Sequence, residues 1–190
     1  MENHQEALAN LCSEALSGRP IADIAAEAVK TIDRVLEVRG AGIWLVEKHG
    51  SVTLAAIHGD PPIPEDVARS RIETSQSSIR DRSALFVIAG AERAAGLLAV
   101  CSHHHLLADE VHFLSAVANV LSQAIARVAS VDQRVAEIAH EFNNVLMGIS
   151  PFVELLKRGD VALERRLRAL DQISRSIQRG QRLTEEILRR

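Results

Sequence analysis

A histidine, a glutamate and an asparagine lie within five consecutive residues, at His140, Glu141 and Asn144. If this stretch is helical, Asn144 follows His140 by about one turn and is rotated from it by roughly 40°. The helix then presents an imidazole, a carboxylate and a carboxamide to water on a rigid support. Such a set contributes little to stability, and it is suited to chemistry with a second protein.

The residues around this set predict a helix that buries one seam against partner helices. Apolar residues recur in alternating steps of four and three, as they do along a helical seam. With Val135 and Phe142 at heptad position a and with Ile138 and Val145 at d, His140 takes position f, the most exposed of the seven. The seam consists of Val131, Val135, Ile138, Phe142, Val145, Ile149, Phe152 and Leu156.

The segment His140-Glu141-Phe142-Asn143-Asn144, in the form AHEFNN, resembles the H-box of sensor histidine kinases. The segment that ends the chain, DQISRSIQRGQRLTEEILRR, resembles the second helix of the same dimerisation and phosphoacceptor domain, called HisKA. The resemblance covers about residues 128–190. Motif, heptad phase and a following antiparallel helix agree with one another, which makes the match fairly specific.

The resemblance implies a role for each residue of the set. His140 is the expected phosphoacceptor, whose neutral imidazole attacks the γ-phosphorus of ATP through Nε2. Glu141 is expected to accept the Nδ1 proton, and Asn144 matches the position that orients water when the partner response regulator is dephosphorylated. A plainer interpretation stays open for each. His140 can be a surface histidine without a role, Glu141 a surface charge, and Asn144 a polar residue on a solvent-exposed face.

The first two thirds of the sequence predict a small sensory module. Helices are expected at 3–17 and 20–37, a hairpin of strands at 43–46 and 52–57, a short helix from Pro64 and two strands at 85–88 and 97–101, while 73–83 shows no periodicity. This order resembles a GAF domain, above all where GLLAV is followed by EVHFLSAVANVLSQAIARV. The ligand-covering interval 59–84 is short, so no bound cofactor is expected.

The fold class expected is α+β. A GAF-like domain with an antiparallel sheet over 1–127 is joined by a long coiled-coil helix, from an N-cap at Asp109 to Lys157, to an all-α hairpin over 128–190. A turn at Arg158-Gly159-Asp160 precedes the second helix, where Gly180 and Thr184 allow close approach. Two such hairpins dimerise as a four-helix bundle. The inner face of the second helix is predicted to carry Leu163, Leu167, Leu170, Ile173, Ile177, Leu183 and Ile187.

Charge and composition exclude several classes of protein. The net charge of −3 divides into −5 over residues 1–130 (11 basic, 16 acidic) and +2 over 131–190 (11 basic, 9 acidic). The basic residues of the second part alternate with acidic ones, so no nucleic-acid partner is expected. We expect neither a membrane span nor a secretion signal. Cys12 and Cys101 are interpreted as small buried residues of a cytoplasmic protein.

The sequence favours neither a metal site nor a nucleotide-binding loop. His103, His104, His105 and His112 are possible metal ligands, but without a supporting Cys or carboxylate cluster a polar loop is the preferred interpretation. The sequence contains neither a G-x-G-x-x-G nor a Walker A pattern. We therefore expect no metal and no cofactor in this chain, and we assign ATP and Mg²⁺ to a separate catalytic domain.

The expected function is the sensory and phosphoacceptor part of a two-component histidine kinase, which belongs to a longer protein and is not active by itself. Its expected partners are a second copy of the chain, an ATP-binding kinase domain and the receiver domain of a response regulator. Two alternatives remain, a stand-alone histidine phosphotransfer protein and a dimeric scaffold or adaptor. Phosphorylation of His140 by a separate kinase domain would distinguish a protein that carries phosphate from a dimeric adaptor.

Overall fold

A computed structural model describes residues 4–47, 49–158 and 162–189. The chain divides into two compact units, Met1–Ala129 and Ser130–Arg190. Helix α4 (Ala108–Lys157) contributes residues to both units, as the four-three spacing predicted. The first unit combines helices with an antiparallel sheet and the second is helical, which confirms the α+β class.

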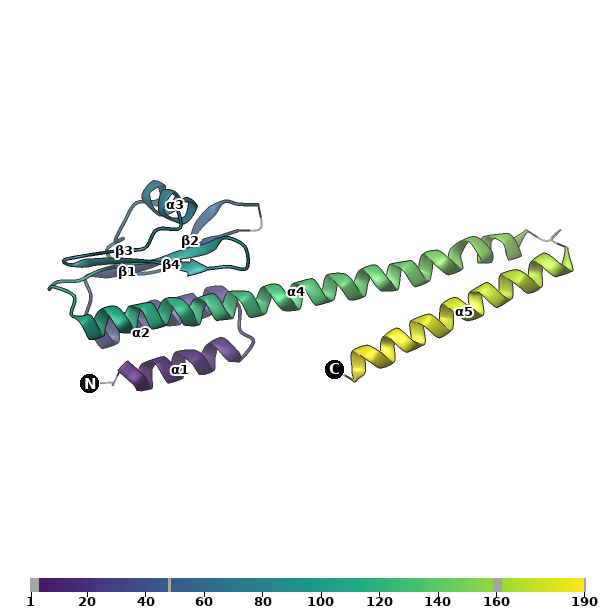
Figure 1. Cartoon of the computed structure of the whole chain (residues 1–190), viewed down its shortest axis with the longest axis horizontal. Helices are drawn as coiled ribbons and strands as arrows, with labels where there is room; N and C mark the ends of the chain where they lie inside the picture. The colour runs from purple at the N-terminus through teal and green to yellow at the C-terminus, as the bar shows by residue number, and fades with distance from the viewer. Residues whose placement is uncertain (1–3, 48, 159–161, 190) are drawn as a thin grey trace. The chain divides into compact units, whose positions relative to one another are not determined.

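The first unit is built on a five-stranded antiparallel sheet (Figure 1). Its strands are β1 (Gly40–Val46), β2 (Val52–Gly59), β3 (Ser78–Arg80), β4 (Ser83–Ala89) and β5 (Ala94–Cys101), in the order β2-β1-β5-β4-β3. The predicted hairpin of β1 and β2 is confirmed, and Gly50 in its turn has the positive φ of 85° that glycine readily adopts. β3 was not predicted.

Helices cover both faces of this sheet (Figure 1). α2 (Ile21–Leu36) and the first part of α4 lie on one face, with α1 (His4–Leu16) packed outside them, and α3 (Glu65–Glu73) lies on the other. The predicted helices are therefore confirmed to within a residue or two at most ends. The larger core lies between the sheet and α2 and α4, and its fully buried side chains include Ile24, Ile32, Ile43, Ile88, Leu98, Val100, Phe113, Leu114, Val117 and Leu121.

A second core lies between the sheet and α3. Trp44 on β1 is 2% exposed and belongs to one buried cluster with Ala68 and Ile72 on α3 and with Leu97 on β5. A Cβ at Gly42 would lie 2.8 Å from the indole ring, so this position has to be glycine for the ring to fold back over its own strand. The large indole thus occupies space between the sheet and α3.

Two predictions about local structure were wrong. Helix α4 begins at Ala108, and the N-cap is Leu107, whose carbonyl accepts the first helical bond from Val111 at 2.9 Å. Asp109 was the predicted cap, but the side chain that caps is Glu110, because its length lets Oε2 reach back to the Leu107 N–H at 2.7 Å.

The cysteines were predicted to be buried, and Cys12 is exposed instead. Helix α1 packs through Ala7, Leu11 and Ala15, which recur every four residues and include two small side chains. This face turns Cys12 and Leu16 towards solvent. Cys101 is partly buried at the end of β5, and both thiols are free.

The core of the first unit gives a direct stability prediction. Leu121 on α4 is fully buried, so Leu121→Ala removes buried methyl groups and is expected to lower the free energy of unfolding by about 2–5 kcal/mol. The emission of Trp44, the single tryptophan of the chain, reports this unit in urea titrations. Leu107→Ala is the control, because Leu107 is 60% exposed and its loss is expected to cost less than about 0.5 kcal/mol. Equal effects of both substitutions would contradict the assigned core.

Candidate functional site

The second unit consists of the last part of α4 and of α5 (Leu163–Leu188), which run antiparallel beside each other (Figure 1). This hairpin was predicted. The Arg158 N–H donates to the carbonyl of Leu155 at 3.2 Å and closes α4, while the predicted turn residues Gly159 and Asp160 lie outside the described residues. Pro151 lies within α4, which continues through it to Lys157.

Small residues bring α4 and α5 into contact. Val145 on α4 is 8% exposed, and a Cβ at Gly180 on α5 would lie 3.3 Å from its Cγ1. A Cβ at Gly148 would lie 3.0 Å from Oγ of Ser176 in the same way. The predicted role of Gly180 in close helix approach is therefore confirmed, and Gly148 makes a second close approach from the other helix.

The predicted seam of α4 is divided between two surfaces. Ile138, Val145, Ile149, Phe152 and Leu156 are buried or partly buried. Val131, Val135 and Phe142 are exposed instead, with 45% of Phe142 accessible. Helix α5 also differs from the prediction, because Ala169, Ile173 and Leu183 are its best-buried apolar residues. Five of the seven residues predicted for its inner face are exposed in the single chain, namely Leu163, Leu167, Leu170, Ile177 and Ile187.

His140 is exposed on α4, as its heptad position predicted. Its ring nitrogen Nδ1 lies 3.3 Å from the amide nitrogen Nδ2 of Asn144. Residues four apart are neighbours on a helix surface, so the pair needs no contribution from another element. Nε2, the nitrogen predicted to react, is not part of this contact.

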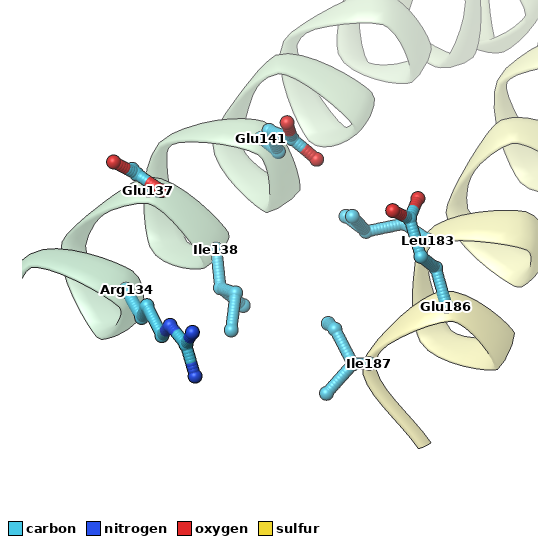
Figure 2. Close-up of a pocket in the computed structure, with 7 residues that line it drawn as sticks. All are labelled: Arg134, Glu137, Ile138, Glu141, Leu183, Glu186 and Ile187. Atoms are coloured by element: carbon cyan, nitrogen blue, oxygen red, sulfur yellow. The ribbon is translucent and has the colours of Figure 1, made fainter. Parts of the chain in front are cut away.

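Glu141 does not share the contact with Nδ1 among the described residues. It follows His140 by one position and therefore lies about 100° around the helix, where adjacent residues do not face each other. Its side chain lines a groove of about 320 Å³ between α4 and α5, in which Ile138 and Ile187 point towards each other (Figure 2). The groove is completed by Arg134, Glu137, Leu183 and Glu186. The role of Glu141 as proton acceptor thus stays a prediction that requires its side chain to turn.

Three arginines beside Glu141 were missed from the sequence. Arg175, Arg179 and Arg182 on α5 line a neighbouring groove of about 520 Å³ together with Glu141 and Glu186. Their spacing of four and three residues puts them on one face of α5, and no acidic residue interrupts 172–184. That spacing was the available signal, and it was obscured because basic and acidic residues alternate in the rest of the segment.

Two histidines of the β5–α4 loop, His104 and His105, lie beside carboxylates. His105 pairs with Asp81, and Nε2 of His104 lies 3.7 Å from Oε1 of Glu110. No group of three or more His, Cys, Asp or Glu side chains suited to a metal ion occurs within residues 4–47, 49–158 and 162–189. The free thiols Cys12 and Cys101 form no part of such a group.

Helix α4 is long and apolar enough to be a candidate membrane span by length and composition. Its most apolar 18-residue window has a mean hydropathy of 1.3, and 33% of that window is buried. One such helix is weak evidence for a span, because buried core helices pass the same test and the first part of α4 contributes residues to the core of the first unit.

Comparison with protein families identifies one match. Residues 130–190 match the model of the His Kinase A (phospho-acceptor) domain, which includes the exposed His140 and both helices of the hairpin. No curated protein matches the sequence.

Solved structures resemble the first unit. The GAF domain of the potassium sensor histidine kinase KdpD from Escherichia coli aligns with a TM-score of 0.58 and 16% identity, over 69% of this chain and 99% of that one. The GAF domain of an Acinetobacter phosphoenolpyruvate-protein phosphotransferase aligns at 0.56 and 15%, over 69% and 98%. Free methionine-R-sulfoxide reductase from Neisseria meningitidis aligns at 0.56 and 15%, over 66% and 91%. At these identities the likeness establishes the fold alone.

The contact between the two helices can be tested by truncation. Val145→Ala removes two methyl groups from the buried contact with Gly180 and is expected to lower the free energy of unfolding of the hairpin by about 1–3 kcal/mol. Helical circular dichroism during urea titration, at a fixed chain concentration, measures the change. Met147→Ala, at a position 72% exposed, is expected to change it by less than about 0.5 kcal/mol. A neutral Val145→Ala would refute the close approach at this position.

Proposed function

We propose that this chain, which carries a His Kinase A (phospho-acceptor) domain behind a domain with the GAF fold, is the sensory and phosphoacceptor part of a two-component sensor histidine kinase. The observation that carries the proposal is the exposed His140 inside the matched segment, held on one helix of an antiparallel hairpin. The contact with Asn144 is made by Nδ1 and not by Nε2, the nitrogen proposed to react.

The reaction proposed for His140 is in-line transfer of the γ-phosphoryl group of ATP. Nε2 of the neutral imidazole supplies the electron pair for the new bond to phosphorus, and the pair of the broken bond leaves with ADP. Glu141 accepts the Nδ1 proton when its side chain turns towards the ring. Exposure serves this chemistry, because both ATP and the next acceptor have to reach the same nitrogen.

The second step is transfer from His140 to an aspartate of a response regulator. A carboxylate oxygen of the receiver domain attacks the phosphorus, and the bonding pair returns to Nε2. When the response regulator is dephosphorylated instead, Asn144 orients the water that hydrolyses the aspartyl phosphate. Asn144 follows His140 by one turn, which keeps its amide on the same exposed face of α4 as the ring.

ATP and its Mg²⁺ are assigned to a separate catalytic domain that approaches His140. The sequence of 190 residues has neither a G-x-G-x-x-G nor a Walker A phosphate-binding pattern. The chain is therefore proposed to be a member of the protein-histidine kinase family that depends on this domain for activity.

The proposed assembly is a homodimer formed by two hairpins. The single chain exposes Val135 and Phe142 on α4, together with Leu167, Leu170 and Ile177 on α5, and apolar surface of this kind marks an interaction site. A second hairpin covers these side chains in a four-helix bundle, the usual arrangement for paired helical hairpins. His140 lies off this seam and stays accessible in the dimer.

The GAF-fold unit is proposed to control the hairpin from the cytoplasm. Helix α4 supplies core residues such as Leu114 and Leu121 to the first unit and His140 to the second, so one continuous helix is the covalent path between them. No nucleic-acid partner is proposed, because the hairpin carries both charge signs along α5.

Phosphate incorporation tests the proposed function. The chain is mixed with radiolabelled ATP, with or without an isolated ATP-binding domain of a histidine kinase, and His140→Ala is run in parallel. We expect acid-labile label that appears only when the domain is added and that disappears in the variant, because an N–P bond to histidine hydrolyses in acid. Asn143→Ala is the matched control and is expected to be labelled normally.

Two results would change the interpretation. Label from ATP alone would reveal a nucleotide site within the chain. Absence of label with a matching kinase domain would exclude the phosphoacceptor role and leave the dimeric adaptor.

Dimerisation is tested separately. Phe142→Ala is expected to weaken a bundle that buries this ring by about 3–5 kcal/mol per site, which corresponds to at least a hundredfold higher dissociation constant. Sedimentation equilibrium measures the constant. Met147→Ala removes a side chain outside the seam and is expected to leave it unchanged. If both variants dimerise like the unaltered chain, the exposed face around Phe142 is not the dimer interface.

A further inference from the structure

Asn144 makes a polar contact with the imidazole of His140. Its amide nitrogen lies 3.3 Å from Nδ1, one helical turn away, and both side chains are exposed on the same helix. The contact is made at Nδ1, which is the ring nitrogen that does not form the bond to phosphorus. The contact therefore influences which ring nitrogen carries the proton before the phosphoryl group is transferred.

The two neutral forms of imidazole differ in reactivity at Nε2. A proton on Nδ1 leaves the lone pair of Nε2 free to attack phosphorus, whereas a proton on Nε2 removes that lone pair. The hydrogen bond that one nitrogen makes determines which form is populated. An amide beside Nδ1 is consequently in the position that selects the form.

A carboxamide can select either form, because its two ends are nearly equal in size and have opposite hydrogen-bonding roles. With Nδ2 towards the ring, the amide donates to Nδ1 and the ring proton is on Nε2. After a half-turn of the amide, Oδ1 takes the same place and accepts a hydrogen bond from Nδ1–H. The second arrangement leaves Nε2 ready to react.

We propose that Asn144 is a positioning residue for phosphoryl transfer, whose Oδ1 accepts Nδ1–H of His140 and so holds the imidazole in the form with a free lone pair on Nε2. This inference rests on the proposed function and adds to it a role for Asn144 in phosphorylation of the chain itself. Glu141, about 100° around the helix and lining the groove with α5, does not provide this contact.

The transfer step balances with Asn144 in this role. Nε2 supplies the electron pair of the new N–P bond, the bond from phosphorus to the leaving group breaks, and its pair departs with that group. The ring is then cationic, and its proton remains on Nδ1 in the hydrogen bond to Oδ1. An amide oxygen does not take up the proton, so Glu141 or water removes it afterwards.

Nuclear magnetic resonance of the whole chain with ¹⁵N-labelled histidine tests the proposal. Two-bond proton–nitrogen correlations of a neutral imidazole distinguish Nδ1–H from Nε2–H, and His140→Ala identifies the signals among the eight histidines. The unaltered chain is expected to favour Nδ1–H. In Asn144→Ala, the ratio of Nδ1–H to Nε2–H is expected to fall by about two- to tenfold, the range for one exposed hydrogen bond. Asn143→Ala is expected to leave the ratio unchanged.

Asn144→Asp provides a second readout with nearly the same shape. A carboxylate at this place only accepts, so the variant is expected to keep Nδ1–H and to raise the pKa of His140, because a nearby negative charge favours the imidazolium. The pKa follows from the chemical shifts of the ring during a pH titration. Asn144→Ala lacks this charge and is expected to show no such rise.

The rate of phosphorylation is measured on the same proteins with phosphoramidate, a small phosphoryl donor that needs no ATP-binding domain and releases ammonia. The rate for Asn144→Ala is expected to fall in step with the fraction of Nδ1–H. An unchanged tautomer ratio in Asn144→Ala, or an unaltered chain that favours Nε2–H, would overturn the role of Asn144. Failure of the unaltered chain to take up phosphate from any donor would instead overturn the proposed function, while the tautomer ratio would still decide the role of Asn144.

Discussion

The contact between Val145 and Gly180 determines which side of α4 is available for chemistry. A residue on a helix has a fixed angular relation to every other, and His140 precedes Val145 by five positions, or about 140° around the axis. Once Val145 is turned towards α5, His140 has to face away from it, and Asn144 follows on the same exposed side. The absence of a side chain at Gly180 is what lets the helices come this close, since a Cβ there would lie 3.3 Å from Val145. Packing and accessibility of the histidine are thus two consequences of one contact.

The same contact accounts for the apolar surface that the single chain exposes. Each helix of the hairpin has more apolar residues than one partner helix can cover, so burial of Ile138, Val145 and Ile149 leaves Val135 and Phe142 in water. A four-helix bundle gives each helix two neighbours, which is the number that the width of the apolar stripe demands. Periodicity in a sequence records the total width of the stripe and not its division between partners. For this reason the seam was predicted as one surface and is found as two.

The sequence predicted regular elements well and their details less well. The helices and the four longer strands follow from long periodic or apolar runs, but β3 has only three residues and shows no pattern by itself, since its pairing with β4 alone defines it. The N-cap at Leu107 was missed because the capping side chain is Glu110, three residues further on. Cys12 was misplaced because two alanines, Ala7 and Ala15, form the packing face of α1, and alanine carries little weight in a hydrophobic pattern. In each case a contact with a neighbouring element or a backbone group, which the sequence pattern does not show, determined the local structure.

At the candidate site, residue types could be predicted and contacts could not. The segment that resembles the H-box gave His140, Glu141 and Asn144, and the heptad gave the exposure of His140. The resemblance assigned Nδ1 to Glu141, whereas the structure puts Asn144 beside it. Helical geometry explains the difference, since positions four apart are adjacent and positions one apart are separated by about 100°. The carboxylate and the amide consequently have different places, one towards the groove with α5 and one beside the ring. A carboxylate held at Nδ1 would favour the charged imidazolium, which is not nucleophilic, whereas an amide can orient the ring without charging it.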